Sequence, residues 1–193
     1  RVLFRSEFLS ASRKEARRKL GLDDGFTIFS VGGSSGANAI NEMAADIMAW
    51  HCGEGKINHI HGYGKHGRES FPQMLAARGI DLGRYPRIQA REYIDDMALW
   101  TAAADLIISR AGAITISELE VTGKASILVP YPYAAENHQY HNAKVLEDHG
   151  AAILIEEKDY RKEDLLARID ELYRNPEKLE ALGRNAASLA AYD

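Results

Sequence analysis

Cysteine is almost absent from this chain of 193 residues, because Cys52 is the only one. No internal disulfide can form, and a reducing cytosol fits this composition. No apolar run approaches the roughly 18–20 residues that a membrane-spanning helix needs. The net charge of −4 provides no excess of positive charge for binding a phosphate backbone, so we expect no nucleic-acid partner.

The first residues also lack the features of a secretory leader. Charges interrupt Arg1–Glu7, no apolar stretch follows, and the chain does not begin with methionine. We therefore expect a piece of a longer protein, although a trimmed terminus would look the same. Residues 1–24 are expected to form a lead-in segment, with a basic helix at Arg13–Lys19 that is a solvated surface. Residues 25–193 are expected to form one domain with a helical tail.

Short apolar runs rich in β-forming residues alternate with longer helical patterns along the chain. This alternation predicts βαβ units, and thus an α/β fold with a Rossmann-like, doubly wound parallel sheet of about six strands. The expected strands are Phe26–Val31, Ile57–His61, Arg87–Ala90, Leu106–Ser109, Ser126–Val129 and Ala152–Ile155. The expected helices are Ala37–Trp50, Phe71–Arg78, Met97–Ala103, Ile114–Val121, His138–Asp148, Lys162–Tyr173 and Pro176–Leu189.

Two turns of small residues follow strands one and four of this expected sheet. Gly32-Gly33-Ser34-Ser35-Gly36 follows the first strand and Arg110-Ala111-Gly112-Ala113 follows the fourth. In the common order 3-2-1-4-5-6 these strands are neighbours at the switch point, where ligands bind. Glycine permits close backbone approach, and helix N-termini offer N–H groups to an anion. Two such turns favour a diphosphate site, although glycines after strands also serve simply as tight turns.

Two motifs are missing, and their absence narrows the choice of nucleotide that such a site would bind. The glycine spacing is G-G-x-x-G rather than the G-x-G-x-x-G of NAD-binding proteins, and His61–Lys65 contains no acid for a ribose. The phosphate-binding pattern G-x-x-x-x-G-K-[ST] is absent as well. NAD binding and ATP hydrolysis are therefore not expected.

Glu118 is the best candidate for binding ribose hydroxyls, because it follows the second turn by about one helical turn. Its alternative role is compensation of the helix dipole. The segment Glu136–Asn142 is dense in amides and imidazoles, which suit the hydroxyls of a sugar. Its alternative reading is a polar helix start capped by Asn137.

No metal site is expected. His59 and His61 share one face of a strand, but no third ligand lies at a matching spacing, so structural histidines are the better interpretation. The adjacent Asp95 and Asp96 do not share a face. Asp95 is expected to cap the following helix.

Four segments together resemble the MurG family of glycosyltransferases, in the family's order and over nearly the whole chain. They correspond to only the second half of such an enzyme, which consists of two Rossmann-like domains in the arrangement called GT-B. The segments are Val31–Ala37 followed by Asn41, Arg91–Met97, Ser109–Glu118 and His138–Ala143.

The resemblance implies a role for each matching residue. Ser34, with Ser35 and the neighbouring glycines, would meet the diphosphate, the backbone of Ile94 would read the uracil edge, and Glu118 would bind the ribose. Arg110, Gly112, Ala113, Ile114 and Thr115 would surround the nucleotide, and His138, Gln139 and Asn142 would contact the sugar. Arg5 matches a family arginine that could contact a phosphate, although Arg1–Phe4 replaces the turn that precedes it in the family.

For the complete protein, the resemblance implies an inverting hexosyltransferase of bacterial peptidoglycan synthesis without cofactor or bound metal. It would move N-acetylglucosamine from UDP-N-acetylglucosamine to lipid-linked muramyl-pentapeptide, as a cytoplasmic enzyme peripheral on the inner face of the cell membrane. The acceptor domain and the candidate general base would lie in the missing N-terminal half, so no catalytic residue is expected in this chain. The alternatives are a related glycolipid transferase and a non-catalytic nucleotide-binding subunit.

Overall fold

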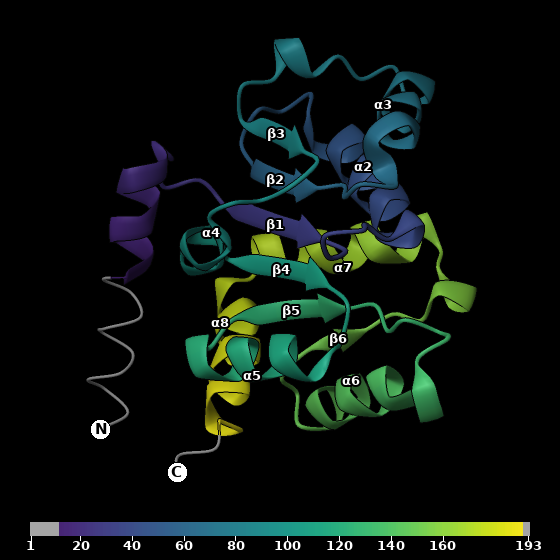
Figure 1. Ribbon diagram of the computed structural model, residues 1–193. Coiled ribbons are helices and arrows are strands. Elements are labelled where there is room, and N and C mark those ends of the chain that lie inside the picture. Colours follow the sequence, from purple (N-terminus) through teal and green to yellow (C-terminus); the bar gives the residue numbers. More distant parts are fainter. Residues whose placement is uncertain (1–11, 191–193) are drawn as a thin grey trace.

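The computed structural model describes residues 12–190, and these form one six-stranded parallel sheet with helices on both faces (Figure 1). The strand order is β3-β2-β1-β4-β5-β6, and all five pairings are parallel. The expected fold class is thereby confirmed. The strands are β1 (Thr27–Val31), β2 (Asn58–Gly62), β3 (Ile88–Arg91), β4 (Leu106–Ser109), β5 (Ala125–Leu128) and β6 (Ile153–Leu154).

Every expected helix is present, with one boundary clearly displaced. Helix α3 begins at Gly67 rather than at Phe71, because four polar or small residues and the interior Pro72 hide its first turn in the sequence. Three short 3₁₀ helices, Leu82–Arg84, Ala135–Asn137 and Glu157–Asp159, were not predicted. The helices are α2 (Asn38–His51), α3 (Gly67–Ala77), α4 (Met97–Ala103), α5 (Ala113–Thr122), α6 (His138–Asp148), α7 (Lys162–Arg174) and α8 (Pro176–Ser188).

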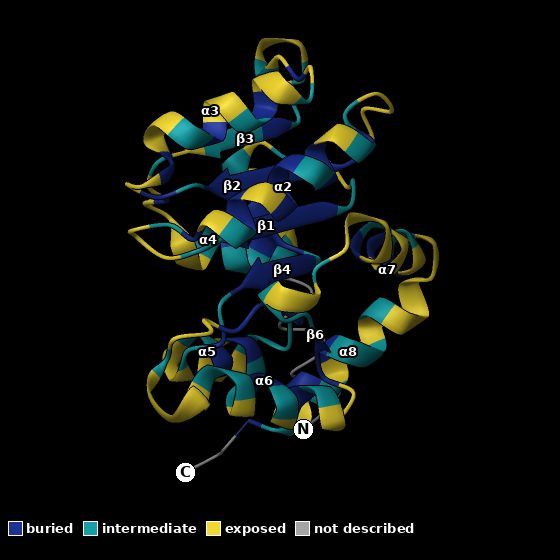
Figure 2. Cartoon of the chain, turned by 90° about the vertical axis from the view of Figure 1, so that its right-hand side faces the viewer, coloured by how far each residue is buried: buried dark blue, intermediate teal, exposed yellow. Residues whose placement is uncertain are grey.

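Two apolar layers hold the helices on the sheet. Successive strand side chains point to opposite faces, so Ile28 packs beneath α2 and α7, and the next residue, Phe29, packs beneath α4, α5 and α6. Both faces of the central strands are covered, so even their polar residues, such as Ser30 and His61, are buried. Figure 2 shows the strands as a buried layer between these helices.

The lead-in helix, residues 12–20, is docked through Arg13 and Arg17, which corrects the expectation for these two residues, while Lys14, Arg18 and Lys19 are exposed as expected. Arg17 is 8% exposed. Its guanidinium donates to Asp105 Oδ2 at 2.6 Å and to the carbonyls of Ala103 and Gly25 at 3.1 and 3.2 Å. Arg13 pairs with the other oxygen of the same carboxylate at 3.2 Å. Charge pairing with the start of β4 therefore places this helix against the domain.

The carboxyl ends of all strands lie along one edge of the sheet, which faces the viewer in Figure 2. Helices α2, α5 and α6 begin at this edge, because each follows a strand in a right-handed βαβ connection. None of the helices within residues 12–190 combines the length and the apolarity that a bilayer crossing requires.

Candidate functional site

The glycine-rich turn after β1 is packed against the turn after β2. Gly33 and Gly36 have φ values of 91° and 88°, which side-chain-bearing residues rarely adopt. A Cβ on Gly36 would lie 2.3 Å from the Tyr63 carbonyl oxygen. The Lys65 and His66 amides donate to the carbonyls of Ser34 and Ser35 at 3.1 and 2.9 Å. The two turns therefore form one unit, and the side chains of Ser34 and Ser35 are exposed on it.

Two helix N-termini at the switch point have no side-chain cap. The N-cap residue is Ala37 for α2 and Gly112 for α5, and neither has a side chain that could accept from the helix N–H groups. Strands β1 and β4, which precede these helices, are hydrogen-bonded neighbours, with Ser30 opposite Ile108. Two positive helix ends with no side-chain cap therefore lie at adjoining strand ends, an arrangement that favours an anion such as a diphosphate.

The turn after β4 is held by side chains of α6. Gln139 Oε1 accepts from the amides of Ala111 and Tyr131 at 3.2 and 2.9 Å, and Asn142 Nδ2 donates to the Ala111 carbonyl at 3.0 Å. Gln139 Nε2 lies 3.9 Å from the position that a Cβ on Gly112 would take. The carbonyl end of Gln139 thus fixes two loops, while its amide nitrogen lies beside the start of α5.

Arg110 lies in the same turn but is engaged within the protein. Its guanidinium donates to the carbonyls of Val129 and Pro130 at 3.2 and 3.1 Å and pairs with Glu157 at 3.2 Å. It also lies over the ring of Tyr131, 5.5 Å from the centroid. These contacts join the ends of β4 and β5, so the observed role of Arg110 is to hold the shape of the turn.

Glu118 is the sixth residue of α5, and its exposed side chain borders an open hollow. The first turn of the helix, including Thr115, contains no acidic residue. Because dipole compensation acts within the first turn, that alternative reading of Glu118 is wrong. The hollow is lined by Ala113, Ile114, Ser117, Glu118, Val121 and Thr122, and Ile114 is 78% exposed. Glu118 therefore lies on the same open surface as the start of α5.

Ile94 is anchored by its side chain and not by its backbone. The side chain is buried, and a Cβ on Gly62 would lie 2.8 Å from its Cγ1. Among the residues that the structure describes, no hydrogen bond occupies the N–H of Ile94. Its carbonyl lies at the start of the turn that leads into α4.

The segment Glu136–Asn142, which was expected to contact a sugar, contains an unusual turn. Glu136 and Asn137 both have positive φ, 53° and 56°, although neither is glycine. The Asn137 side chain makes no capping hydrogen bond to α6, so the expected alternative of an asparagine cap is wrong. His138 is exposed at the start of α6, and its Nδ1 donates to the Ala135 carbonyl at 2.9 Å, which leaves Nε2 as an acceptor.

Asp95 does not cap α4. The N-cap residue is Asp96, and it too makes no side-chain capping bond. Arg5 lies outside the described residues, so its expected phosphate contact has no structural counterpart to report.

Sequence reasoning did not include Asn41 and His61 among the site residues. Both are buried, and Asn41 Nδ2 donates to the Tyr63 carbonyl at 3.1 Å while its Oδ1 lies 2.7 Å from His61 Nε2. Burial lowers the pKa of His61 to about 3, so the ring is neutral. A polar residue at a buried position of α2 was the available sign in the sequence, because buried amides need partners.

The comparisons with known proteins agree with this geometry. Residues 27–193 match the family described as "Glycosyltransferase family 28 C-terminal domain". A relative from Desulforamulus reducens is 39% identical over 186 residues, which are 96% of this chain and 50% of the relative. A relative from Desulfitobacterium hafniense is 40% identical over 190 residues, 98% of this chain and 51% of the relative. Both are named UDP-N-acetylglucosamine--N-acetylmuramyl-(pentapeptide) pyrophosphoryl-undecaprenol N-acetylglucosamine transferase.

A solved structure supports the same assignment. The crystal structure of MurG from Acinetobacter baumannii aligns with this chain at a TM-score of 0.76 and 33% identity. The aligned part covers 92% of this chain and 49% of the MurG chain. The C-terminal domain of the LpcC glycosyltransferase from Francisella tularensis, at 13% identity and a TM-score of 0.65, shares the fold. The chain spans about half the length of the curated relatives it matches. It belongs to the glycosyltransferase family 28 C-terminal domain family, which confirms the resemblance to MurG.

Proposed function

We propose that this chain is the donor-binding half of an inverting transferase. The whole protein would move N-acetylglucosamine from UDP-N-acetylglucosamine to lipid-linked muramyl-pentapeptide. The observation that carries the proposal is the pair of uncapped helix starts, α2 and α5, at adjoining strand ends, with Glu118 on the open face of α5. The names of the two relatives supply the donor and the acceptor.

The proposed contacts follow from the geometry of the turns. The diphosphate would accept from the N–H groups of Gly33–Ser35, in the turn before α2, and of Ala113–Thr115, at the start of α5. These donors would stabilise the UDP leaving group without a bound metal ion. Glu118 would accept from both ribose hydroxyls, and the backbone of Ile94 would pair with the uracil edge.

The sugar would lie between α5 and α6. Gln139 Nε2 would donate to a sugar hydroxyl beside Gly112, while the Nε2 atom of His138 would accept from another. Asn142 would act mainly by holding Ala111. The acceptor, the general base and the contact with the inner face of the cell membrane would belong to the preceding domain of a complete protein in the cytoplasm.

Calorimetry with the purified chain tests this proposal. The chain should bind UDP and UDP-N-acetylglucosamine, also in the presence of EDTA, and should give no heat with NAD, because no acid follows β2. Glu118→Ala should weaken UDP binding by about 1.5–3 kcal/mol, the usual loss for hydrogen bonds to a charged group.

The matched control is Glu163→Ala, which removes an exposed carboxylate from the first turn of α7. Its UDP affinity should equal that of the parent. Equal binding of UDP and NAD by the parent chain would contradict the proposed function. Unchanged UDP affinity in Glu118→Ala would remove Glu118 from the site.

A further inference from the structure

A chain of buried polar side chains runs through the domain from the end of α2 to the turn after β2. His51 Nε2 lies 3.3 Å from His59 Nδ1, and His59 Nε2 lies 2.8 Å from Ser30 Oγ. Ser30 Oγ lies 2.7 Å from His61 Nδ1, and His61 Nε2 lies 2.7 Å from Asn41 Oδ1. All five side chains are buried. None of them belongs to the nucleotide-facing surface, so the proposed donor contacts leave their arrangement unexplained.

The direction of every hydrogen bond in this chain follows from its last member. The Tyr63 carbonyl only accepts, so the Asn41 nitrogen must face it, and Asn41 Oδ1 must face His61. His61 Nε2 therefore carries the proton, and its Nδ1 accepts from the Ser30 hydroxyl.

The remaining bonds follow in turn. The Ser30 oxygen accepts from His59 Nε2, and His59 Nδ1 then accepts from His51 Nε2. In every one of these bonds the donor lies on the side of His51 and the acceptor on the side of Tyr63. Hydrogen bonds aligned in this way strengthen one another.

The Ser30 hydroxyl supports the tautomer that Asn41 sets, because it is the donor that faces His61 Nδ1. His61 Nδ1 also lies 3.1 Å from the Ser30 carbonyl oxygen, which could accept a proton from it. In that tautomer His61 Nε2 would be an acceptor facing Asn41 Oδ1 at 2.7 Å, and two acceptors at this distance repel. The amide of Asn41 would then have to turn, and the bond to Tyr63 would be lost.

We propose that the Ser30–His61–Asn41 relay positions the diphosphate-binding turn by holding the turn after β2 against it. Asn41 binds the carbonyl of Tyr63, the same oxygen that lies 2.3 Å from the position of a Cβ on Gly36. Ser30, His61 and Asn41 are positioning residues, because none of them is placed against the nucleotide. This inference rests on the proposed donor site.

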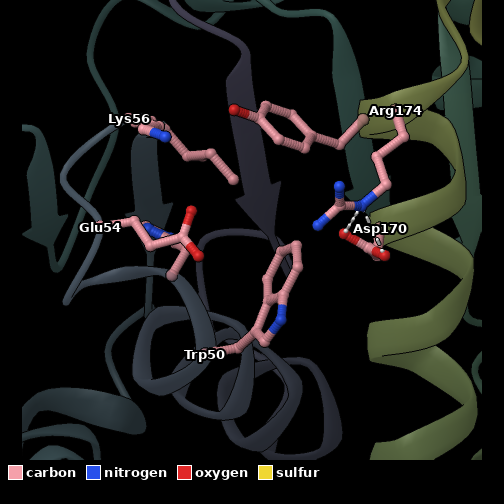
Figure 3. A pocket seen from close by; sticks show the side chains of 8 residues that line it. Trp50, Glu54, Lys56, Asp170 and Arg174 are labelled. Carbon is pink, nitrogen blue, oxygen red and sulfur yellow. Dashed lines mark hydrogen bonds and ion pairs between the residues drawn. The ribbon is translucent and has the colours of Figure 1, made fainter.

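The chain of buried polar side chains ends at His51, which borders a small cavity on the side of the domain opposite the proposed donor site. His51 lines it together with Trp50, Lys56 and Arg174, and its volume is about 50 Å³, room for a few waters at most (Figure 3). Arg174 is paired with Asp170 at 2.9 Å across its wall. The cavity is too small for a nucleotide, so it offers no second nucleotide site.

Two measurements on the full chain test the relay. Long-range ¹H–¹⁵N correlation spectra report the histidine tautomers in the protein without nucleotide, and we expect the Nε2–H form for His51, His59 and His61. In Ser30→Ala, His61 should change to the Nδ1–H form, and UDP affinity should fall about three- to tenfold, as for the loss of one hydrogen bond. Ser30→Thr restores the hydroxyl and should restore both the tautomer and the affinity.

His149→Gln is the control, because His149 is exposed at the end of α6, and it should change neither reading. If His61 adopts the Nδ1–H form in the parent chain, the proposed hydrogen-bond relay is wrong. A tautomer change in Ser30→Ala with parental UDP affinity overturns the positioning role. A parent chain that binds no UDP overturns the proposed function and the positioning role together, whatever the tautomers are.

Discussion

At the scale of single residues, the three buried histidines link the stability of the domain to pH. Burial lowers the pKa of His51 to about 4 and that of His61 to about 3, and it holds the pKa of His59 well below 6.5. The neighbouring histidines lower the pKa of His59 further. In the unfolded chain these rings protonate near 6.5. Below that pH the unfolded state binds more protons than the folded one, so acid destabilises the fold.

We therefore expect the free energy of unfolding to be highest above about pH 7 and to fall as the pH decreases from 6.5 toward 4. Below pH 6.5 each neutral buried histidine contributes a slope that approaches about 1.4 kcal/mol per pH unit, and above 6.5 the slope vanishes. Each histidine should therefore cost about 1.4 kcal/mol between pH 7.5 and 5.5, and the three together on the order of 4 kcal/mol. Urea unfolding at the two pH values measures the difference. His51→Gln should remove about one third of it, and a free energy that stays constant over this range would disprove the linkage.

At the scale of elements, the tail helix α8 depends on one close contact with the loop after α5. Gly183 is a buried residue of α8, and a Cβ there would lie 2.6 Å from the Gly123 carbonyl oxygen. Gly123 itself ends α5 in the left-handed conformation, with φ 63°. The helix can therefore approach β5 closely only where it has no side chain.

Gly183→Ala should destabilise the protein by about 1–3 kcal/mol, the usual cost of forcing an extra methyl group into a packed contact. This loss should exceed the gain in helix propensity, which is at most about 1 kcal/mol. Gly53→Ala is the matched control, because a Cβ there would meet nothing within 4 Å. Thermal unfolding of both variants measures the difference, and a Gly183→Ala variant as stable as Gly53→Ala would show that α8 can shift freely.

At the scale of the whole molecule, this chain spans about half the length of its relatives, and we expect it to carry out donor binding but not the complete proposed reaction. The described turns at the carboxyl edge account for the proposed binding of the nucleotide and the donor sugar. The proposed reaction also needs an acceptor hydroxyl held in register and deprotonated. Positioned bases contribute typically 10²–10⁴-fold in rate, and correct positioning of the two substrates contributes more.

The chain alone is accordingly expected to transfer no radiolabelled N-acetylglucosamine to a lipid-linked muramyl-pentapeptide above background, even at saturating donor. The complete enzyme from Desulforamulus reducens, assayed under the same conditions, is the positive control. Addition of that enzyme's first half, expressed separately, should raise transfer if the two halves associate. Turnover by the chain alone at a rate near that of the complete relative would place the catalytic groups in this half.

The sequence by itself determined the fold class and the place of the candidate site. Six apolar β-rich runs separated by helical patterns admit few arrangements, and right-handed crossovers leave the glycine-rich turns after β1 and β4 side by side. Strands such as β4 were predicted to the residue, because Leu106–Ser109 is buried on both faces and bounded by polar residues or turns. Local patterns of this kind depend only on neighbouring residues, so they can be read without the fold.

Only the tertiary structure decided what the polar side chains do. Arg110 was expected beside the nucleotide from the sequence, and the structure adds that it joins two loops, because the carbonyls of Val129 and Pro130 end beside it. His61 and Asn41 are 20 positions apart and no pattern in the sequence linked them to each other, yet a 2.7 Å contact joins them. Hydrogen-bond partners depend on distances between strands and helices that are remote in sequence. Residue spacing along the chain does not contain those distances, because packing of the apolar faces sets them.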